Sequence, residues 1–224
     1  MYIPGEWLPT WLGIALGIMV LGVVLVAVRT AQWRKLSGQP ERIHLVAGGA
    51  VCCLVLWLLD IRFEGGVGIH LLGITTLTLL AGWSFTLLAG IGIVVGFALA
   101  RDLALPALPA TDLLSIVVPA TVTRSVLVLL LRPGLGNPFT YILGAGVLGG
   151  GFAALAIAVA GILLLIIAGI AGPVASALEY WPLIFLMMFS EGFINGMCAA
   201  ALAVFYPQWL KTYDEQFFLG EKRQ

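Results

Sequence analysis

The chain has 224 residues, of which 61% are hydrophobic and 10% charged, and its 11 basic side chains balance its 11 acidic ones. A mean hydropathy of +1.10 excludes a soluble globular domain, because such a composition would expose a very large apolar surface to water. No basic patch indicates nucleic acid, and no polybasic run indicates binding to anionic lipid. The sequence therefore predicts an integral membrane protein.

Six apolar runs are long enough to cross a membrane as helices. They cover about residues 9–28, 43–59, 83–100, 112–131, 139–168 and 181–206. A shorter run, about 69–81, ends at Gly82, which would let it turn directly into the next helix. We therefore predict an all-α membrane protein, a bundle of seven helices of which one is short.

Small residues predict close packing of these helices. The chain contains 28 glycines, and small residues let helix backbones approach closely within a membrane. The run 139–168 contains GAGVLGGG at 144–151, which predicts a broken or tilted helix. We expect one domain over residues 1–210, followed by a short amphipathic cytoplasmic tail over residues 211–224.

Lysine and arginine predict the orientation, because positive charge is retained on the cytoplasmic side. An outside N-terminus leaves only Arg62 and Arg101 outside. The basic residues then placed inside are Arg29, Arg34, Lys35, Arg42, Arg132, Lys211, Lys222 and Arg223. We therefore predict an N-terminus outside and a C-terminus inside.

Three ionisable side chains, His70, Arg124 and Glu191, lie within apolar segments. Such groups are costly at membrane depth and usually face a partner or a cavity. Because Arg124 and Glu191 occupy different helices, we predict that they pair or share a polar network. The alternative is that each snorkels or bonds separately to backbone carbonyls and hydroxyls. His70 is either a satisfied hydrogen-bonding group or, with another donor nearby, a ligand for nickel, copper, zinc or cobalt.

Signatures of soluble enzymes are absent from the sequence. It contains no GxxxxGK[ST], HExxH, CxxC or GxSxG motif. Nothing in the spacing of Ser, Cys and His favours a catalytic triad. We therefore predict that the protein is not an enzyme and has no catalytic residues.

Three segments can be compared with a known family: MYIPGEWLP at 1–9, GIHLLGITTLTLLAGWSFTLLAG at 68–90 and SEGFINGMCAAALAVFYPQWL at 190–210. The first resembles the MHIPDGFL-type start of the CbiM/NikM proteins, the substrate-binding membrane components of energy-coupling-factor transporters for cobalt and nickel. The second resembles that family's GHLLGGALAAILLGPWAALLL-type segment, and the third its closing EGLITA...RPELL-type helix. The resemblance implies metal transport across a bacterial cytoplasmic (inner) membrane, with a coupling transmembrane subunit and ATPase subunits in separate chains.

The same resemblance implies a nitrogen-rich, square-planar metal site. The family's ligands are the free amine of its first residue, the amide nitrogen and imidazole of a histidine at the second position, and the histidine of the GHLLG segment. In this chain they correspond to the backbone nitrogens of Met1 and Tyr2 and the side chain of His70. Tyr2 lacks the imidazole, and a phenol with a pKa of about 10 is a poor substitute. We expect residues 1–9 to fold inward as a plug and the site to be weakened.

The sequence leaves open other transported ions and other functions for the protein. Sulfur donors would favour copper(I) over cobalt or nickel. Candidate further donors are Asp60, Glu64, Met187, Met188, Met197 and Cys198. One alternative function is a divergent scaffold, acting as a subunit or assembly factor of a larger membrane complex without transport. A third interpretation is an intramembrane enzyme that uses Arg124 and Glu191.

Overall fold

A computed structural model describes residues 3–34, 38–59, 61–62, 68–132, 135–179 and 181–219. Its first half contains η1 (Gly5–Trp7), α1 (Thr10–Thr30), α3 (Pro40–Leu58), β1 (Ile61–Arg62), β2 (Gly68–Ile69), α4 (Ile74–Ala81) and α5 (Trp83–Arg101). There follow η2 (Leu105–Ala107), α6 (Leu108–Asp112), η3 (Leu113–Val117), α7 (Val118–Leu130), η4 (Thr140–Leu148) and α8 (Gly149–Ile167). The chain continues through α9 (Ala171–Glu179), α10 (Trp181–Phe205), η5 (Pro207–Trp209) and α11 (Glu215–Leu219). Within these described residues the fold is helical apart from one antiparallel pairing, in which Ile61 lies opposite Ile69 and Arg62 opposite Gly68.

The six predicted spans are all present. Among the described residues, six helical stretches are long and apolar enough to cross a membrane: Thr10–Thr30, Pro40–Leu58, Trp83–Arg101, Leu105–Leu130, Thr140–Ile167 and Trp181–Phe205. The fourth begins earlier than the predicted residue 112, because Pro106 and Pro109 lie in the first turns of η2 and α6, where proline is tolerated. The seven predicted helices include α4 but not the short α9 and α11.

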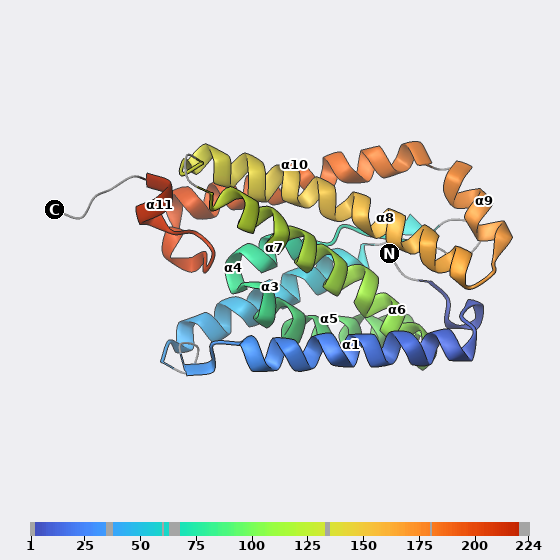
Figure 1. The fold of residues 1–224 in the computed structure, drawn as a ribbon. Coiled ribbons are helices and arrows are strands. Elements are labelled where there is room, and N and C mark those ends of the chain that lie inside the picture. The colour runs from blue at the N-terminus through green and yellow to red at the C-terminus, as the bar shows by residue number, and fades with distance from the viewer. Residues whose placement is uncertain are drawn as a thin grey trace.

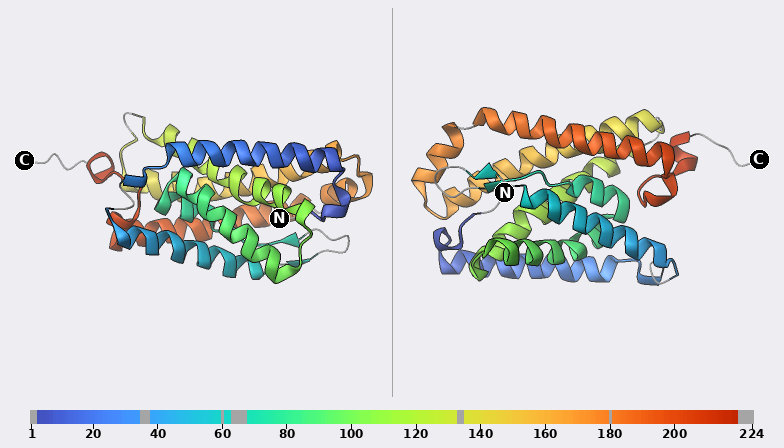
Figure 2. Two further views of the ribbon diagram at one scale, coloured as in Figure 1. Left: turned by 90° about the horizontal axis from the view of Figure 1, so that it is seen from below. Right: turned by 180° about the vertical axis from the view of Figure 1, so that it is seen from behind.

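The helices form two groups with α4 between them (Figure 1). α1 and α3 pack on α5, whereas α10 packs on η4 and α8, and α7 packs on α8. The view from behind in Figure 2 shows the same two groups. α4 contacts α3, α5, α7 and α10, so this short helix occupies the centre of the bundle.

Two glycines frame α4. Gly73 precedes it with a φ of 66° and Gly82 follows it with a φ of 79°; side chains of L-residues are strained in this left-handed region. Gly82 joins α4 directly to α5, as the sequence predicted. Ile74 and Leu79 of α4 are fully buried, which explains how so short a helix is held in place.

The glycine-rich segment permits the tight contact with α10. The run predicted to be broken or tilted is not broken: η4 is π-helical and leads straight into α8. A Cβ at Gly150 would lie 2.8 Å from the carbonyl oxygen of Glu191, and one at Gly192 would lie 2.7 Å from that of Val147. Only glycine allows the two backbones to approach so closely.

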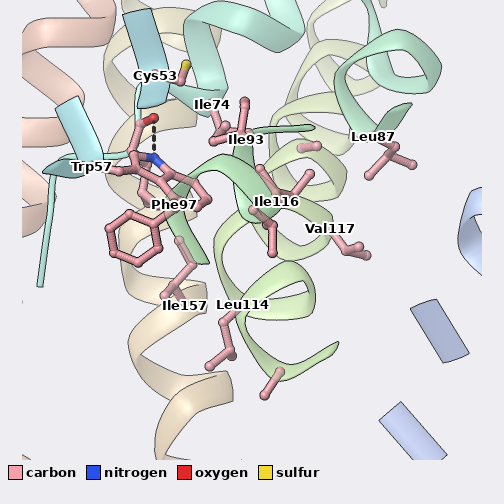
Figure 3. Packing of buried hydrophobic residues seen from close by; sticks show 14 of the residues in the cluster. Cys53, Trp57, Ile74, Leu87, Ile93, Phe97, Leu114, Ile116, Val117 and Ile157 are labelled. Atoms are coloured by element: carbon pink, nitrogen blue, oxygen red, sulfur yellow. Dashed lines mark hydrogen bonds between the residues drawn. The ribbon is translucent and has the colours of Figure 1, made fainter. Parts of the chain in front are cut away.

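The hydrophobic core extends from the centre of the bundle to the described start of the chain. Trp57 and Phe97 are fully buried side by side in it (Figure 3), and their rings meet edge to face at 5.6 Å. Ile3 is also fully buried and belongs to the same core. The described beginning of the chain therefore enters the bundle.

The segment expected to be a separate tail also packs on the bundle as far as it is described. The backbone N–H groups of Lys211 and Thr212 donate to the carbonyls of Leu80 and Leu79, at 3.2 and 3.3 Å. Phe218 is 1% exposed. Packing thus extends beyond the boundary proposed at residue 210, because these residues supply hydrogen bonds to the end of α4.

Candidate metal site

His70 lies on the short connection between β2 and α4 and is 3% exposed. Its ring lies 4.6 Å from the ring of Trp57 and 5.5 Å from that of Phe97, measured between centroids. His70 is outside the six candidate spans, and burial lowers its pKa well below the ordinary value. Burial thus favours the neutral form of the imidazole, which is the form that binds metal ions.

The backbone that follows His70 is held from two sides. The indole Nε1 of Trp57 donates to the carbonyl oxygen of Leu72 at 3.1 Å. The N–H of Leu72 donates to the carboxylate of Glu191 on α10. Leu72 lies between β2 and α4, and buried backbone polar groups outside regular structure need such partners. α3 and α10 thus fix the conformation of the segment that carries His70.

Asn195 extends this network to α4. Its side-chain nitrogen donates to one carboxylate oxygen of Glu191 at 2.8 Å, and its side-chain oxygen accepts from the N–H and hydroxyl of Thr76 at 2.8 and 2.7 Å. Glu191 and Asn195 are four residues apart and so share one face of α10. We call Trp57, His70, Thr76, Glu191 and Asn195 the buried polar cluster.

Glu191 also has a favourable electrostatic position. Its partner Leu72 lies just before the first residue of α4, Ile74. The N-terminal end of a helix carries partial positive charge, which favours a nearby carboxylate. Together with its hydrogen bonds, this position explains how an acidic side chain that is 3% exposed is accommodated.

The predicted pairing of Arg124 with Glu191 is not among the described contacts. The Arg124 guanidinium lies 4.8 Å above the Trp83 ring on an exposed face, whereas Glu191 bonds to Leu72 and Asn195. Each of the two charged side chains thus has a described partner of its own, and the pairing stays a prediction. The pairing was predicted from the opposite charges alone, because the sequence does not show which faces of the helices meet.

Of the predicted ligands, the structure describes His70; Met1 and Tyr2 lie outside the described residues, as do Asp60 and Glu64. The backbone ligands therefore remain a prediction. Within the described ranges there is no group of three or more His, Cys, Asp or Glu side chains that could hold a metal. Among the sulfur candidates, Met197 is 57% exposed, which places it away from the cluster.

Sequence reasoning missed Trp57 and Asn195. Asn195 had a signal, because it follows Glu191 by four residues in SEGFING and must share its helix face. Trp57 had no such sequence signal, because its hydrogen bond to Leu72 depends on how α3 packs on the connection between β2 and α4.

Together these features define a multi-pass helical membrane protein with a buried histidine on the connection between β2 and α4. Residues 2–209 match the family described as the cobalt uptake substrate-specific transmembrane region, CbiM. The chain belongs to this family, which confirms the resemblance seen in the sequence.

Solved structures support the same fold. One, described as a truncated transition metal transporter, has a TM-score of 0.70 and 18% identity, covering 91% of this chain and 99% of its own. Another, described as a transition metal transporter, has a TM-score of 0.68 and 19% identity, and the match covers 93% of this chain and 92% of that one. No curated protein sequence matches this chain. At sequence identities of 18% and 19%, the similarity shows a shared fold and no more.

Proposed function

We propose that this chain is the membrane substrate-binding component of a transition-metal transporter, with His70 as a side-chain ligand of the transported ion. Membership of a cobalt-uptake family supports the class of substrate. The observation that carries the proposal is the buried imidazole of His70, on a backbone segment that Trp57 and Glu191 hold through Leu72. Partners beyond the ligands orient a metal-binding histidine and strengthen binding.

The backbone nitrogens of Met1 and Tyr2 complete the proposed ligand set. Burial of Ile3 in the core supports an inward path for the start of the chain. Nitrogen ligands suit cobalt, nickel and copper(II), and we assign the substrate to cobalt or nickel because of the family. Since Tyr2 supplies no imidazole, we expect a lower affinity than a site with histidine at that position would have.

In the proposed assembly, the N-terminus lies outside a bacterial inner membrane and α4 counts as a seventh helix that does not cross it. Energy would come from ATPase subunits through a coupling membrane subunit, as in energy-coupling-factor transporters. This division of labour is supported by the absence of a nucleotide-binding motif from the sequence.

The test is the metal content of the purified protein, measured by elemental mass spectrometry. We expect a stoichiometric amount of cobalt or nickel that is lost in His70→Ala. His44→Ala is the matched control, because His44 is exposed near the start of α3 and should not affect binding. Equal metal content in both variants would contradict the proposal.

The substitution Tyr2→His tests the ligand set itself. It supplies the imidazole that the family has at this position, so the affinity for nickel and cobalt should rise. Tyr2→Phe removes the phenol alone and should leave the affinity unchanged. Equal affinities in a titration of Tyr2→His and the natural protein would show that the family's site geometry is lost in this chain, and would contradict the proposed ligand set.

A second candidate function is a scaffold within a larger membrane complex. Tyr2 in place of the family's histidine is the observation that favours it. The scaffold requires no metal, so assembly with partner subunits should persist in His70→Ala. A metal-free protein that assembles normally would favour the scaffold over transport.

A further inference from the structure

A cavity of about 540 Å³ opens at one end of the bundle. It lies where α1 ends, α3 begins and α4 ends, and residues after η5 close one side. Figure 1 shows the end of α1, the start of α3 and α11 at this same end of the molecule. None of the residues of the buried polar cluster lines it.

The charge of the lining is positive. Arg42 and Lys211 contribute cations, Gln32 and Gln39 contribute amides, and the described lining contains no carboxylate. The Arg42 guanidinium donates to the side chain of Gln39 and to the carbonyl of Gln208. A guanidinium has five N–H donors, so those two bonds leave others for an anionic ligand.

The remaining wall is apolar. Leu45, Leu80 and Phe85 line the cavity beside the cations, and the Lys211 ammonium lies 4.7 Å above the Phe85 ring. A free inorganic anion would leave this apolar wall without a partner. A ligand that joins a phosphate to an apolar portion would contact both kinds of surface.

Aromatic side chains place this cavity at the edge of the membrane. Trp209 lines it and stacks on Tyr206 at 4.4 Å between centroids, and Trp33, just beyond the end of α1, is 48% exposed. Tryptophan and tyrosine are enriched at the level of the lipid headgroups. The cavity therefore lies where a phospholipid phosphate is available.

We propose that this cavity binds the phosphate of an anionic phospholipid. The phosphate lies between Arg42 and Lys211, and the glycerol and the first part of the acyl chains lie against Leu45 and Leu80. Basic pockets between transmembrane helices bind such headgroups. No sequence pattern indicates this site, because Arg42 and Lys211 are far apart in the chain and only folding brings them to one cavity.

The test is native mass spectrometry of the detergent-purified chain with added phosphatidylglycerol, phosphatidylcholine or inorganic phosphate. We expect phosphatidylglycerol to remain bound and phosphatidylcholine not to. The double variant Arg42→Gln with Lys211→Gln should retain about tenfold less phosphatidylglycerol. The matched control, Arg29→Gln with Arg132→Gln, removes two exposed cations outside the lining and should retain it fully.

Arg42→Gln alone provides the same test with less change to packing, and should show an intermediate loss. Equal retention by the natural protein and the cavity variants would overturn the proposal, as would equal binding of phosphatidylcholine. Binding of inorganic phosphate without phosphatidylglycerol would identify free phosphate as the ligand and overturn the lipid assignment. The metal content of each variant, measured separately, distinguishes these outcomes from failure of the transport proposal.

Discussion

Two regions of the bundle handle an ionisable side chain within a span in opposite ways. In the buried polar cluster, Glu191 directs its carboxylate to the backbone of Leu72 and to Asn195. On the outer face formed by α5 and α7, Arg124 rests on the ring of Trp83 and remains exposed. Position in a membrane helix therefore does not assign a role to a charged residue; its partners do.

Removal of these two side chains should lower the stability of the protein by different amounts. Removing the carboxylate of Glu191 leaves the buried N–H of Leu72 without its acceptor, a loss of about 1–3 kcal/mol. Removing Arg124 forfeits an exposed cation–π contact of about 0.5–1 kcal/mol. Substitutions in the buried polar cluster should thus lower both stability and metal affinity. Substitutions on the outer face formed by α5 and α7 should lower stability slightly and leave metal affinity unchanged.

The largest effect is expected from Gly150→Leu, which would push α8 away from α10 at Glu191. The new side chain meets the Glu191 carbonyl already at its Cβ, so the free energy of unfolding should fall by about 3 kcal/mol. Thermal unfolding in detergent measures this loss. Gly22→Leu is the control, because nothing lies within 4 Å of a Cβ there. Similar melting temperatures for the two variants would show that the tight contact is not required.

Glu191→Leu should weaken metal binding by about tenfold or more, because partners that orient a ligand contribute 10–100-fold to affinity. Glu191→Gln keeps an oxygen that can accept from Leu72 and should retain most of the affinity. A titration with nickel measures both. If leucine and glutamine have the same effect, Glu191 does not position the His70 segment.

Trp57→Phe should lower the free energy of unfolding by about 1 kcal/mol through loss of the bond to the Leu72 carbonyl. Phenylalanine keeps an aromatic ring beside His70, but it is smaller than the fully buried indole, so the loss also includes the cost of a small cavity. Trp33→Phe is the control, since its indole donates to Val28 at an exposed position. Equal denaturant midpoints for the two variants would argue against a role for the Trp57 bond.

Arg124→Gln should have the smallest effect, within about 1 kcal/mol of stability, and should not change nickel affinity. A matched titration against Glu191→Leu checks this. A fall in affinity as large as that of Glu191→Leu would show that the outer face communicates with the metal site and would remove the distinction between the two regions.

The spans and the turn at Gly82 could be predicted because hydropathy and glycine are local signals. His70 could be selected because it lies in a segment that resembles a known motif. Other features depend on which faces meet: the Trp57 bond to Leu72, the separate partners of Arg124 and Glu191, and the packing of Thr212 on α4. The π-helical η4 also has no sequence signature, because it arises where glycines fit against α10.

The central claim, that His70 is a metal ligand, is tested most directly by X-ray absorption at the nickel edge of the loaded protein. We predict a shell of nitrogen neighbours with the scattering pattern of an imidazole. The pattern should persist in His44→Ala, whereas His70→Ala should retain no nickel. A sulfur shell, or an unchanged imidazole pattern in His70→Ala, would contradict the claim.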